Sequence, residues 1–334
     1  MNRKLLRIGT RESQLAMWQA NRVKELLAQQ GYESELIYIK SEGDIDLKTP
    51  LYEMGVQGIF TRSLDIALLN NRIDLAVHSM KDVPTQLPKG IIQSAVLERA
   101  SYKDLLVYKG DRTEIEKLMA HSESSLHLST NNHQIPTIHG QLSSVNSQLK
   151  IATSSIRRKA QWLHRYPNHT IENLRGNVNT RLKKVEESDW NGAIFAAAGL
   201  ERIHLRPEKS MELNWMLPAP AQGAIVVVCR EEDPFTFDAS SNLNHEETAL
   251  CTSIEKGFLR TLMGGCSTPV SALAEIENGQ VHFQGNLLSV DGKEKVEIEK
   301  FISINDAENL GELAAREMLA NGGQAIADTI QHER

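Results

Sequence analysis

Arginine side chains are concentrated between residues 151 and 206 of the 334-residue chain. This stretch holds ten basic and five acidic residues, a local balance of +5 in a chain whose net charge is −6. Arginine suits carboxylates and phosphates because its planar guanidinium can donate two parallel hydrogen bonds to them. The chemistry that this pattern predicts is the binding of an anionic ligand with several such groups.

Several of these arginines occupy positions that are typical of anion sites. Arg157 and Arg158 follow two serines that can begin a helix, and Arg175 lies in a strand-to-helix turn. The helix dipole disfavours cations in the first turn, whereas the free N–H groups there attract anions. We therefore expect an anionic ligand to join Arg157 and Arg158. Arg11 and Ser13 repeat the arrangement near the N-terminus, so several anion sites should converge on one cleft.

Cys266 is the candidate nucleophile. It follows two glycines just after an expected helix, and Pro269 stiffens the exit of the loop. This arrangement could present a thiol to a bulky partner. Cys229 lies in an apolar run and Cys251 on a helix, where both are expected to be inert packing residues. An unreactive loop cysteine is the alternative for Cys266, and no motif nominates the histidine that a cysteine protease requires.

Lys81 and Asp82 are candidate ligand-binding residues because of their position in the chain. They follow an expected strand, Ile73–His78, and precede Pro84, which cannot extend that strand. Both side chains should therefore lie on a loop at the C-terminal end of the strand, the edge at which open α/β sheets bind ligands. A turn-capping aspartate is the alternative for Asp82.

Composition limits the class of protein. With 40% hydrophobic and 24% charged residues, the chain can fill more than one core, and its length predicts two or three domains. Three cysteines without a C-x-x-C pair predict neither a disulfide framework nor a zinc site. No signal-peptide core and no apolar run of about 18 residues is present, so we expect a cytoplasmic protein that spans no membrane. Because the arginine cluster has no interleaved aromatics, nucleic acid is disfavoured, whereas a solvated basic face stays possible for any single arginine.

Short β-like runs alternate with helical patterns along most of the chain. Strands are expected at Leu5–Ile8, Leu36–Ile39, Ile73–His78, Lys150–Thr153, Thr170–Leu174, Ala193–Ala197 and Ala224–Cys229. Helices are expected from Ser13 to Gly31, from Phe60 to Asn70, from Ser154 to Leu163, from Asn177 to Glu187, from Glu246 to Leu262 and from Ala307 to Leu319. Asn278-Gly279 and Asp291-Gly292 predict hairpin turns in the C-terminal part.

The pattern predicts an α/β protein with two lobes and a small C-terminal α+β domain. Residues 110–150 are rich in polar residues without a sustained period, which indicates an exposed insertion. The strand at Ala224–Cys229 comes after the second lobe and could return to the first, and two crossings would make a hinged cleft. We expect lobe 1 at residues 1–107 and 222–240, lobe 2 at 108–221, and the C-terminal domain with Cys266 at 241–334.

Six segments resemble, in order, the porphobilinogen deaminases (hydroxymethylbilane synthases). They are Ile8–Ala16, Asp74–Pro84, Ala152–Arg158, Leu174–Leu182, Ala197–Leu200 and Gly264–Cys266. The resemblance implies two lobes of mixed sheets like those of periplasmic binding proteins, with a third domain. It also implies head-to-tail condensation of four porphobilinogen units, with loss of ammonia, on a dipyrromethane cofactor joined to Cys266. Hydrolysis then releases hydroxymethylbilane and leaves the cofactor behind.

The resemblance also implies roles for single residues. Asp82 would be catalytic, hydrogen-bonding the pyrrole N–H groups, stabilising the cationic species and helping to move protons. The implied cofactor ligands are Lys81, Thr153, Ser154, Ser155, Arg157, Arg158, Arg181 and Gln222. The implied substrate ligands are Arg11, Ser13, Gln19, Arg175 and Arg202. No metal is expected, porphobilinogen is the expected partner, and a monomer is the family expectation.

Three positions depart from the family pattern. Gln57 replaces a usual lysine, Glu42 a usual arginine and Ala221 a usual glycine. The first two changes bear on the loop over the active site and on the rate, whereas the core chemistry should survive them. A non-enzymatic two-lobed module for a small polyanion is the main alternative, although it would have no use for Cys266. A divergent relative without activity is the third.

Overall fold

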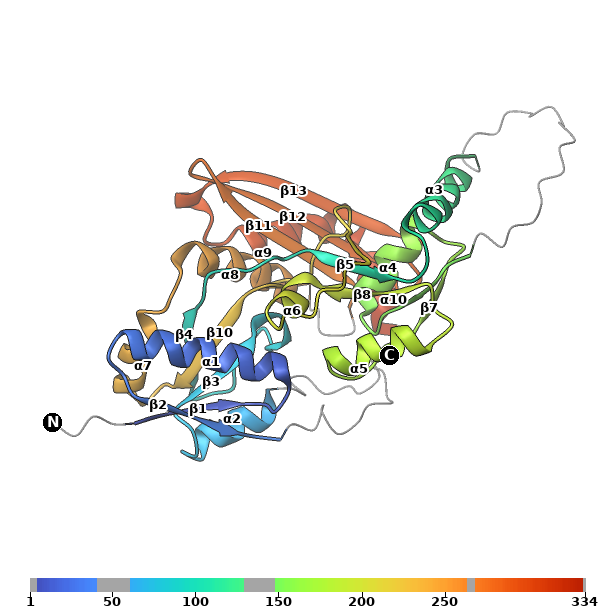
Figure 1. The fold of residues 1–334 in the computed structure, drawn as a ribbon. Coiled ribbons are helices and arrows are strands. Elements are labelled where there is room, and N and C mark those ends of the chain that lie inside the picture. The colour runs from blue at the N-terminus through green and yellow to red at the C-terminus, as the bar shows by residue number, and fades with distance from the viewer. Residues whose placement is uncertain (1–4, 41–60, 129–147, 263–267, 333–334) are drawn as a thin grey trace, which may run out of the picture.

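The structure is a computed structural model that describes residues 5–40, 61–128, 148–262 and 268–332. Its described strands form two five-stranded sheets and one three-stranded sheet. Figure 1 shows the first sheet with α1 and α2 at the lower left, the second with α4 and α5 to the right, and the three-stranded sheet along the top. The expected fold class is confirmed. Among the described residues, no helix combines the length and the apolar character that crossing a membrane requires.

The first sheet has the strand order β2-β1-β3-β10-β4. Its strands are β1 (Leu6–Thr10), β2 (Ser34–Tyr38), β3 (Leu75–Ser79), β4 (Ile91–Val96) and β10 (Ile225–Arg230). Strand β10 pairs antiparallel with both β3 and β4, so the predicted return of the chain to the first sheet is confirmed. Helices α1 (Gln14–Gln29) and α7 (Pro234–Ser241) pack on one face, and α2 (Arg62–Leu69) on the other.

The second sheet has the order β7-β6-β8-β5-β9. Its strands are β5 (Asp104–Tyr108), β6 (Lys150–Ala152), β7 (Thr170–Glu172), β8 (Gly192–Ala196) and β9 (Ser210–Glu212). Helix α4 (Ile156–Arg165) packs on one face, and α5 (Val178–Glu187) with α6 (Ala197–Glu201) on the other. Because β5 pairs with β8 and β9, the chain enters this sheet at Asp104. This corrects the lobe boundary that we expected after residue 107.

The polar stretch at 110–150, which we expected to be an exposed insertion, begins with a helix, α3 (Arg112–Leu128). Asp111 accepts hydrogen bonds from the backbone N–H groups of Thr113 and Glu114 and so caps the helix start. Ile115 is buried in the core of the second sheet, against which Leu118 and Met119 also pack. Only this narrow apolar stripe marks the helix in a polar sequence, which is why the sequence did not indicate it. Residues 129–147 lie outside the described residues.

The C-terminal part folds as an antiparallel meander of β11 (Val270–Glu277), β12 (Gln280–Leu288) and β13 (Lys295–Ser303). Its helices are α8 (Glu246–Thr261), α9 (Leu310–Met318) and α10 (Gln324–His332). Phe258 of α8 and Phe283 of β12 are fully buried at the centre of this core. The β11–β12 turn at Asn278 and Gly279, both with positive φ, confirms the hairpin prediction.

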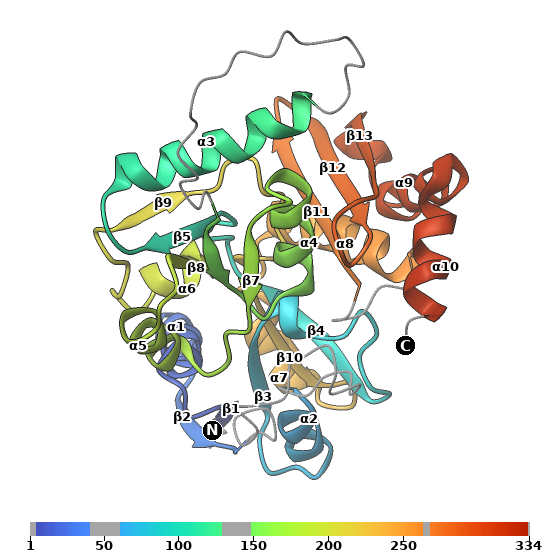
Figure 2. The same ribbon diagram turned by 90° about the vertical axis from the view of Figure 1, so that its right-hand side faces the viewer.

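The two lobes touch along the helices that flank the cleft. Figures 1 and 2 place α1 beside α5, and Asn179 Nδ2 of α5 donates to Gln14 Oε1 of α1 at 3.0 Å. The Arg202 guanidinium lies 5.5 Å from the ring centre of Trp18, another residue of α1. The chain crosses from the second lobe back to the first between β9 and β10, and we call this segment the second crossing. It includes Ala221, whose φ of 62° is a conformation that favours glycine.

Candidate active site

A cleft with a volume of about 390 Å³ lies between the two lobes and the C-terminal domain. It is lined by thirteen of the predicted site residues: Arg11, Ser13, Gln19, Lys81, Asp82, Ser154, Ser155, Arg157, Arg158, Arg175, Arg181, Arg202 and Gln222. Thr153 does not line the cleft; it lies behind Ser155, whose backbone N–H donates to Thr153 Oγ1 at 3.2 Å. Cys266, Gln57 and Glu42 lie outside the described residues.

The wall from the first lobe begins where β1 ends. Ser13 is the N-cap of α1, as predicted, and its Oγ accepts from the backbone N–H of Ala16 at 3.3 Å. Arg11 precedes this cap and lines the cleft. Gln19 is buried, and its Nε2 donates to Ser79 Oγ at 2.8 Å. Helix α1 is thereby tied to the end of β3, where the next candidates lie.

Lys81 and Asp82 lie on a single 3-10 turn (Met80–Asp82) directly after β3, as predicted. Its first residue, Met80, donates its backbone N–H to the Ala224 carbonyl at 3.0 Å, and Lys256 of α8 donates to the Val83 carbonyl. The first sheet and the C-terminal domain together therefore fix this turn. Among the described residues, no side chain donates a hydrogen bond to the partly buried Asp82 carboxylate.

Lys81 is electrostatically unusual. Its Nζ donates to Gln222 Oε1 at 3.3 Å. Burial lowers the pKa of Lys81 to about 8, and the positive charges of Arg158 and Arg157 act in the same direction. The carboxylates of Asp82 and Asp104 oppose this shift. A lysine in this state can bind an anion or exchange a proton near neutral pH.

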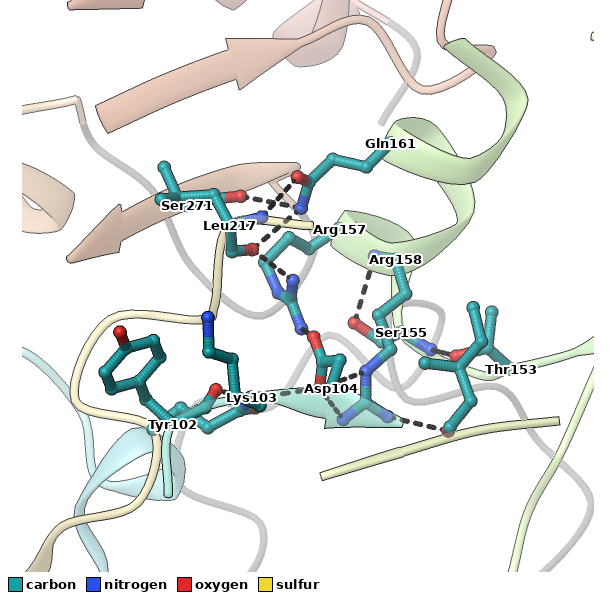
Figure 3. Close-up of polar contacts among 12 residues, drawn as sticks. Tyr102, Lys103, Asp104, Thr153, Ser155, Arg157, Arg158, Gln161, Leu217 and Ser271 are labelled. Atoms are coloured by element: carbon teal, nitrogen blue, oxygen red, sulfur yellow. Dashed lines mark hydrogen bonds and ion pairs between the residues drawn. The ribbon is translucent and has the colours of Figure 1, made fainter. Parts of the chain in front are cut away.

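The anion that joins Arg157 and Arg158 is a residue of the chain itself. Both arginines are buried, with exposed fractions of 4% and 6%. Figure 3 shows the carboxylate of Asp104 between their guanidinium groups, with Arg157 Nη2 and Arg158 Nη2 each 2.7 Å from a carboxylate oxygen. Burial alone would raise the pKa of Asp104, but the two guanidinium groups hold that pKa well below its usual range. Asp104 therefore joins the two arginines within the protein, and the binding of a ligand to them stays a prediction.

Two further arginines of the second lobe lie on or before α5. Arg175 is buried in the turn that precedes the helix. Arg181 is partly buried on α5, and its Nε has no hydrogen-bond partner among the described residues. Burial lowers the pKa of Arg181 to about 10, with contributions from Arg158 and Arg175. An anionic ligand beside Arg181 would stabilise its charged form.

Three of the predicted residues form hydrogen bonds with other groups of the protein. Ser154 Oγ donates to the Leu174 carbonyl at 2.7 Å, and Ser155 caps α4 by accepting from the backbone N–H of Arg158. Arg202 Nη2 donates to the Gly223 carbonyl at 2.7 Å, which ties the second lobe to the second crossing. Burial lowers the pKa of Arg202 to about 10.

His78 lines the cleft but was not predicted, because a single histidine in an apolar strand carries no motif. It is buried near the end of β3, and its Nε2 has no partner among the described residues. Burial lowers its pKa to about 4, and the charge of Arg11 adds to the effect. The imidazole is therefore neutral at pH 7.

The charges of the lining favour a polyanionic ligand. The basic side chains are Arg11, Lys81, Arg157, Arg158, Arg175, Arg181 and Arg202, and among the described residues Asp82 is the only carboxylate that faces them in the lining. Guanidinium groups are donors only, and buried cations are costly unless they are paired. The residues present therefore fit a group that carries several carboxylates, such as a dipyrromethane.

Fold and cleft together define a two-lobed protein whose cleft suits a polyanionic ligand. Its sequence matches the porphobilinogen deaminase dipyrromethane cofactor binding domain over residues 6–238, and the porphobilinogen deaminase C-terminal domain over residues 249–320. The chain belongs to the porphobilinogen deaminase family. The family, the transferase class and the dipyrromethane cofactor that we expected are confirmed, whereas the roles of single residues stay predictions.

Bacterial relatives match over almost the whole chain. The porphobilinogen deaminase of Pelobacter propionicus is 36% identical, covering 97% of this chain and 97% of the relative. That of Syntrophomonas wolfei is 38% identical over 96% and 97%, respectively. Among solved structures, the VFT2 domain of Bordetella pertussis BvgS matches with a TM-score of 0.41 and 10% identity, over 73% of this chain and 90% of that domain. A similarity at that level adds nothing to the assignment.

Proposed function

We propose that the cleft joins four porphobilinogen units head to tail onto a dipyrromethane primer and releases the product as hydroxymethylbilane. The observation that carries this proposal is the lining of the cleft, which seven basic side chains from both lobes share with Asp82. Each unit brings an acetate and a propionate, so the growing chain becomes more negative at every step. Guanidinium groups that can form charge-assisted hydrogen bonds suit such a ligand.

The cofactor would lie against the second lobe and the catalytic turn. Arg157, Arg158, Arg181 and Lys81 would bind its carboxylates, with Gln222 holding Lys81 in place. The implied serine and threonine ligands act here mainly by shaping the start of α4: Ser154, Ser155 and Thr153. When bound, the dipyrromethane supplies the pyrrole carbon to which the first unit is joined.

The incoming unit would lie against the first lobe and the start of α5. Arg11 and Arg175 would bind its carboxylates, and Arg202 would add a third cation to the lining. Gln19 would act by fixing Ser79 and hence the turn that follows it. Ser13 would shape the start of α1 beside Arg11.

Asp82 would be the central catalytic group. Its carboxylate would accept hydrogen bonds from the pyrrole N–H groups and stabilise the cation left when ammonia departs. The carbon–nitrogen bond breaks in that step, and a carbon–carbon bond to the primer then forms. Asp82 would accept the proton that the attacking pyrrole carbon loses.

The variant Asp82→Asn tests this role. It should fold and keep its cofactor, because the carboxylate makes no hydrogen bond to a described side chain. Its rate of porphobilinogen consumption should fall by about 10²–10⁴-fold, the usual contribution of a positioned acid or base. Turnover close to that of the wild type would place the catalytic group elsewhere. Saturable binding of porphobilinogen by the wild type without ammonia release would instead favour a binding module.

Cys266 would carry the cofactor. Thr268 and Val270, which follow it in the sequence, line the cleft, as does Leu259 of α8. Intact-mass measurement should find an adduct of dipyrromethane size on the wild type and none on Cys266→Ser. Cys251→Ser is the matched control, because burial raises the pKa of Cys251 to about 12 and so leaves it a poor nucleophile. An unmodified, fully active wild type would falsify the attachment.

We further propose that the protein works as a monomer in the cytoplasm and binds no nucleic acid. The net charge of −6 disfavours binding to a polyanion over the general surface. Light scattering at micromolar concentration should give the mass of one chain, and added duplex DNA should leave that mass unchanged.

A further inference from the structure

Asp104 is a buried carboxylate at the start of β5 that no sequence motif marked. We infer that Asp104 is a positioning residue, which fixes the orientation of Arg157 and Arg158 toward the dipyrromethane and links them to the catalytic turn. The inference rests on the proposed function, since it concerns the residues that would hold the cofactor.

The first support is the number of contacts that fix each guanidinium. Arg157 donates through Nη2 to Asp104 at 2.7 Å and through Nη1 to the Leu217 carbonyl at 2.6 Å. Arg158 donates to Asp104 through both Nε and Nη2, at 3.1 and 2.7 Å, and through Nη1 to the Ile194 carbonyl at 3.0 Å. Two separate anchors fix the plane of each group, and each still has N–H groups to offer to a ligand.

The second support is the charge that remains. Two guanidinium groups and one carboxylate leave a net charge of +1 in a wall from which water is largely excluded. Without Asp104, two like charges would be buried side by side, and each would gain from turning toward an anionic ligand. Asp104 thus limits how strongly this wall attracts the cofactor while it holds the geometry.

The third support is the connection to the catalytic turn. Gln222 Nε2 donates to Asp104 Oδ1 at 2.9 Å and to the Tyr102 carbonyl at 2.7 Å. The amide oxygen of Gln222 therefore faces the other way, where it accepts from Lys81 Nζ. A chain of contacts runs from the two arginines through Asp104 and Gln222 to Lys81, which is adjacent to Asp82 in the sequence.

This connection makes the charge of Asp104 visible in a pH profile. Besides Asp104, the charged groups that act on Lys81 are Asp82, Arg158 and Arg157. Asp104 is negative and raises the pKa of Lys81, so its removal should let Lys81 lose its proton at lower pH. Where kcat falls at high pH because Lys81 loses its proton, that fall should begin at lower pH in Asp104→Asn than in the wild type.

The test compares three proteins, wild type, Asp104→Asn and Asp74→Asn, each with and without Cys266→Ser. Asp74 is the matched control because it is also buried between two arginines, but its partners, Arg7 and Arg230, do not line the cleft as Arg157 and Arg158 do. The difference in Tm between the members of each pair measures how much the attached cofactor stabilises the fold. We expect a larger gain in Asp104→Asn than in the other two, together with a kcat about 100-fold lower, because a misplaced ligand loses its alignment. Loss of the adduct from Asp104→Asn alone would contradict this expectation, because no gain in Tm would then remain.

Equal gains in the three proteins, or an unchanged kcat in Asp104→Asn, would overturn the inference. If Asp104→Asn does not fold, Asp104→Glu decides, because it keeps the charge but moves the carboxylate by one methylene group. We expect it to keep the wild-type gain in Tm with kcat about tenfold lower, and a wild-type kcat would overturn the positioning role. A wild type without an adduct would contradict the proposed function itself, whatever Asp104 does.

Discussion

Each lobe buries one carboxylate between two arginines. In the first lobe, Asp74 accepts from Arg7 Nε at 3.0 Å and from Arg230 Nη2 at 2.9 Å, which ties β1 to β10. In the second lobe, Asp104 accepts from Arg157 and Arg158 at 2.7 Å each. The donors and the acceptor are chemically the same, yet only the second cluster borders the cleft.

The two clusters differ in charge balance. Arg230 also pairs with Asp233 at 2.9 Å, so two arginines meet two carboxylates in the first lobe. In the second lobe, one carboxylate faces two arginines, so one positive charge of that cluster has no negative charge to balance it. The balanced cluster holds strands of the sheet together, whereas the unbalanced one leaves a charge for a ligand to neutralise.

The clusters also differ in their access to water. The side chains of Arg7 and Arg230 are 32% and 16% exposed, whereas those of Arg157 and Arg158 are 5% and 7% exposed. An arginine that loses its partner at the surface can recover hydration, but a buried one cannot. The same substitution should therefore have unequal effects in the two lobes.

The largest predicted effect is on folding. In the cofactor-free Cys266→Ser background, Asp104→Asn should lower the free energy of unfolding by about 3–5 kcal/mol, the usual cost of breaking a buried ion pair. Asp74→Asn should cost clearly less, because Arg7 can turn to water. Urea denaturation at neutral pH measures both values. Equal losses would mean that exposure of the arginines does not decide the cost, and the comparison would fail.

A smaller effect is expected when Arg158 is replaced by lysine, which has one ammonium group in place of the guanidinium. Arg158 uses Nε and Nη2 on the same carboxylate oxygen, and the single ammonium of a lysine cannot replace both. Arg158→Lys should lower kcat about tenfold and stability by about 1–2 kcal/mol. Arg230→Lys is the control, with a similar loss of stability and an unchanged kcat. A fall in kcat in both variants would show that the first cluster also serves the cleft.

The sequence was sufficient to predict the parts of the site that are local. Ser13 and Ser155 cap the helices that they were expected to begin, and Lys81 and Asp82 lie on the predicted turn. These features depend on neighbours within a few residues, so spacing reveals them.

Asp104 could not be predicted in the same way. It lies 53 and 54 residues before its two arginine partners and forms part of an otherwise apolar strand. Its partners are decided by the order of strands in the second sheet, which places β5 beside β8, and not by any motif. The sequence predicted an anion beside Arg157 and Arg158, but nothing in it showed that the chain itself supplies one.

The smallest predicted effect concerns Lys81, a cation whose pKa is lowered beside the second cluster. Beside the first cluster the shift has the opposite direction, because the hydrogen bond to Asp74 raises the pKa of Arg7. In the cofactor-free protein, burial lowers the pKa of Lys81 to about 8, below the ordinary value of 10.5. Between pH 8 and pH 10.5 the Lys81 side chain holds its proton more tightly in the unfolded chain than in the folded protein. The contribution of Lys81 to the free energy of unfolding therefore increases as pH rises through this range. Lys81→Met should therefore be more stable than its parent at pH 7, on the order of 1 kcal/mol, and the difference should shrink toward pH 10.

Urea denaturation at pH 7, 8.5 and 10 in the Cys266→Ser background measures that difference, with Lys24→Met on the exposed face of α1 as the control. The control should show no such trend, because an exposed ammonium keeps its hydration in the folded protein. A constant difference between Lys81→Met and its parent at all three pH values would mean that Lys81 stays hydrated as well. The link from Asp104 through Gln222 to the catalytic turn would then carry no charge effect, and the second cluster would differ from the first only in where it lies.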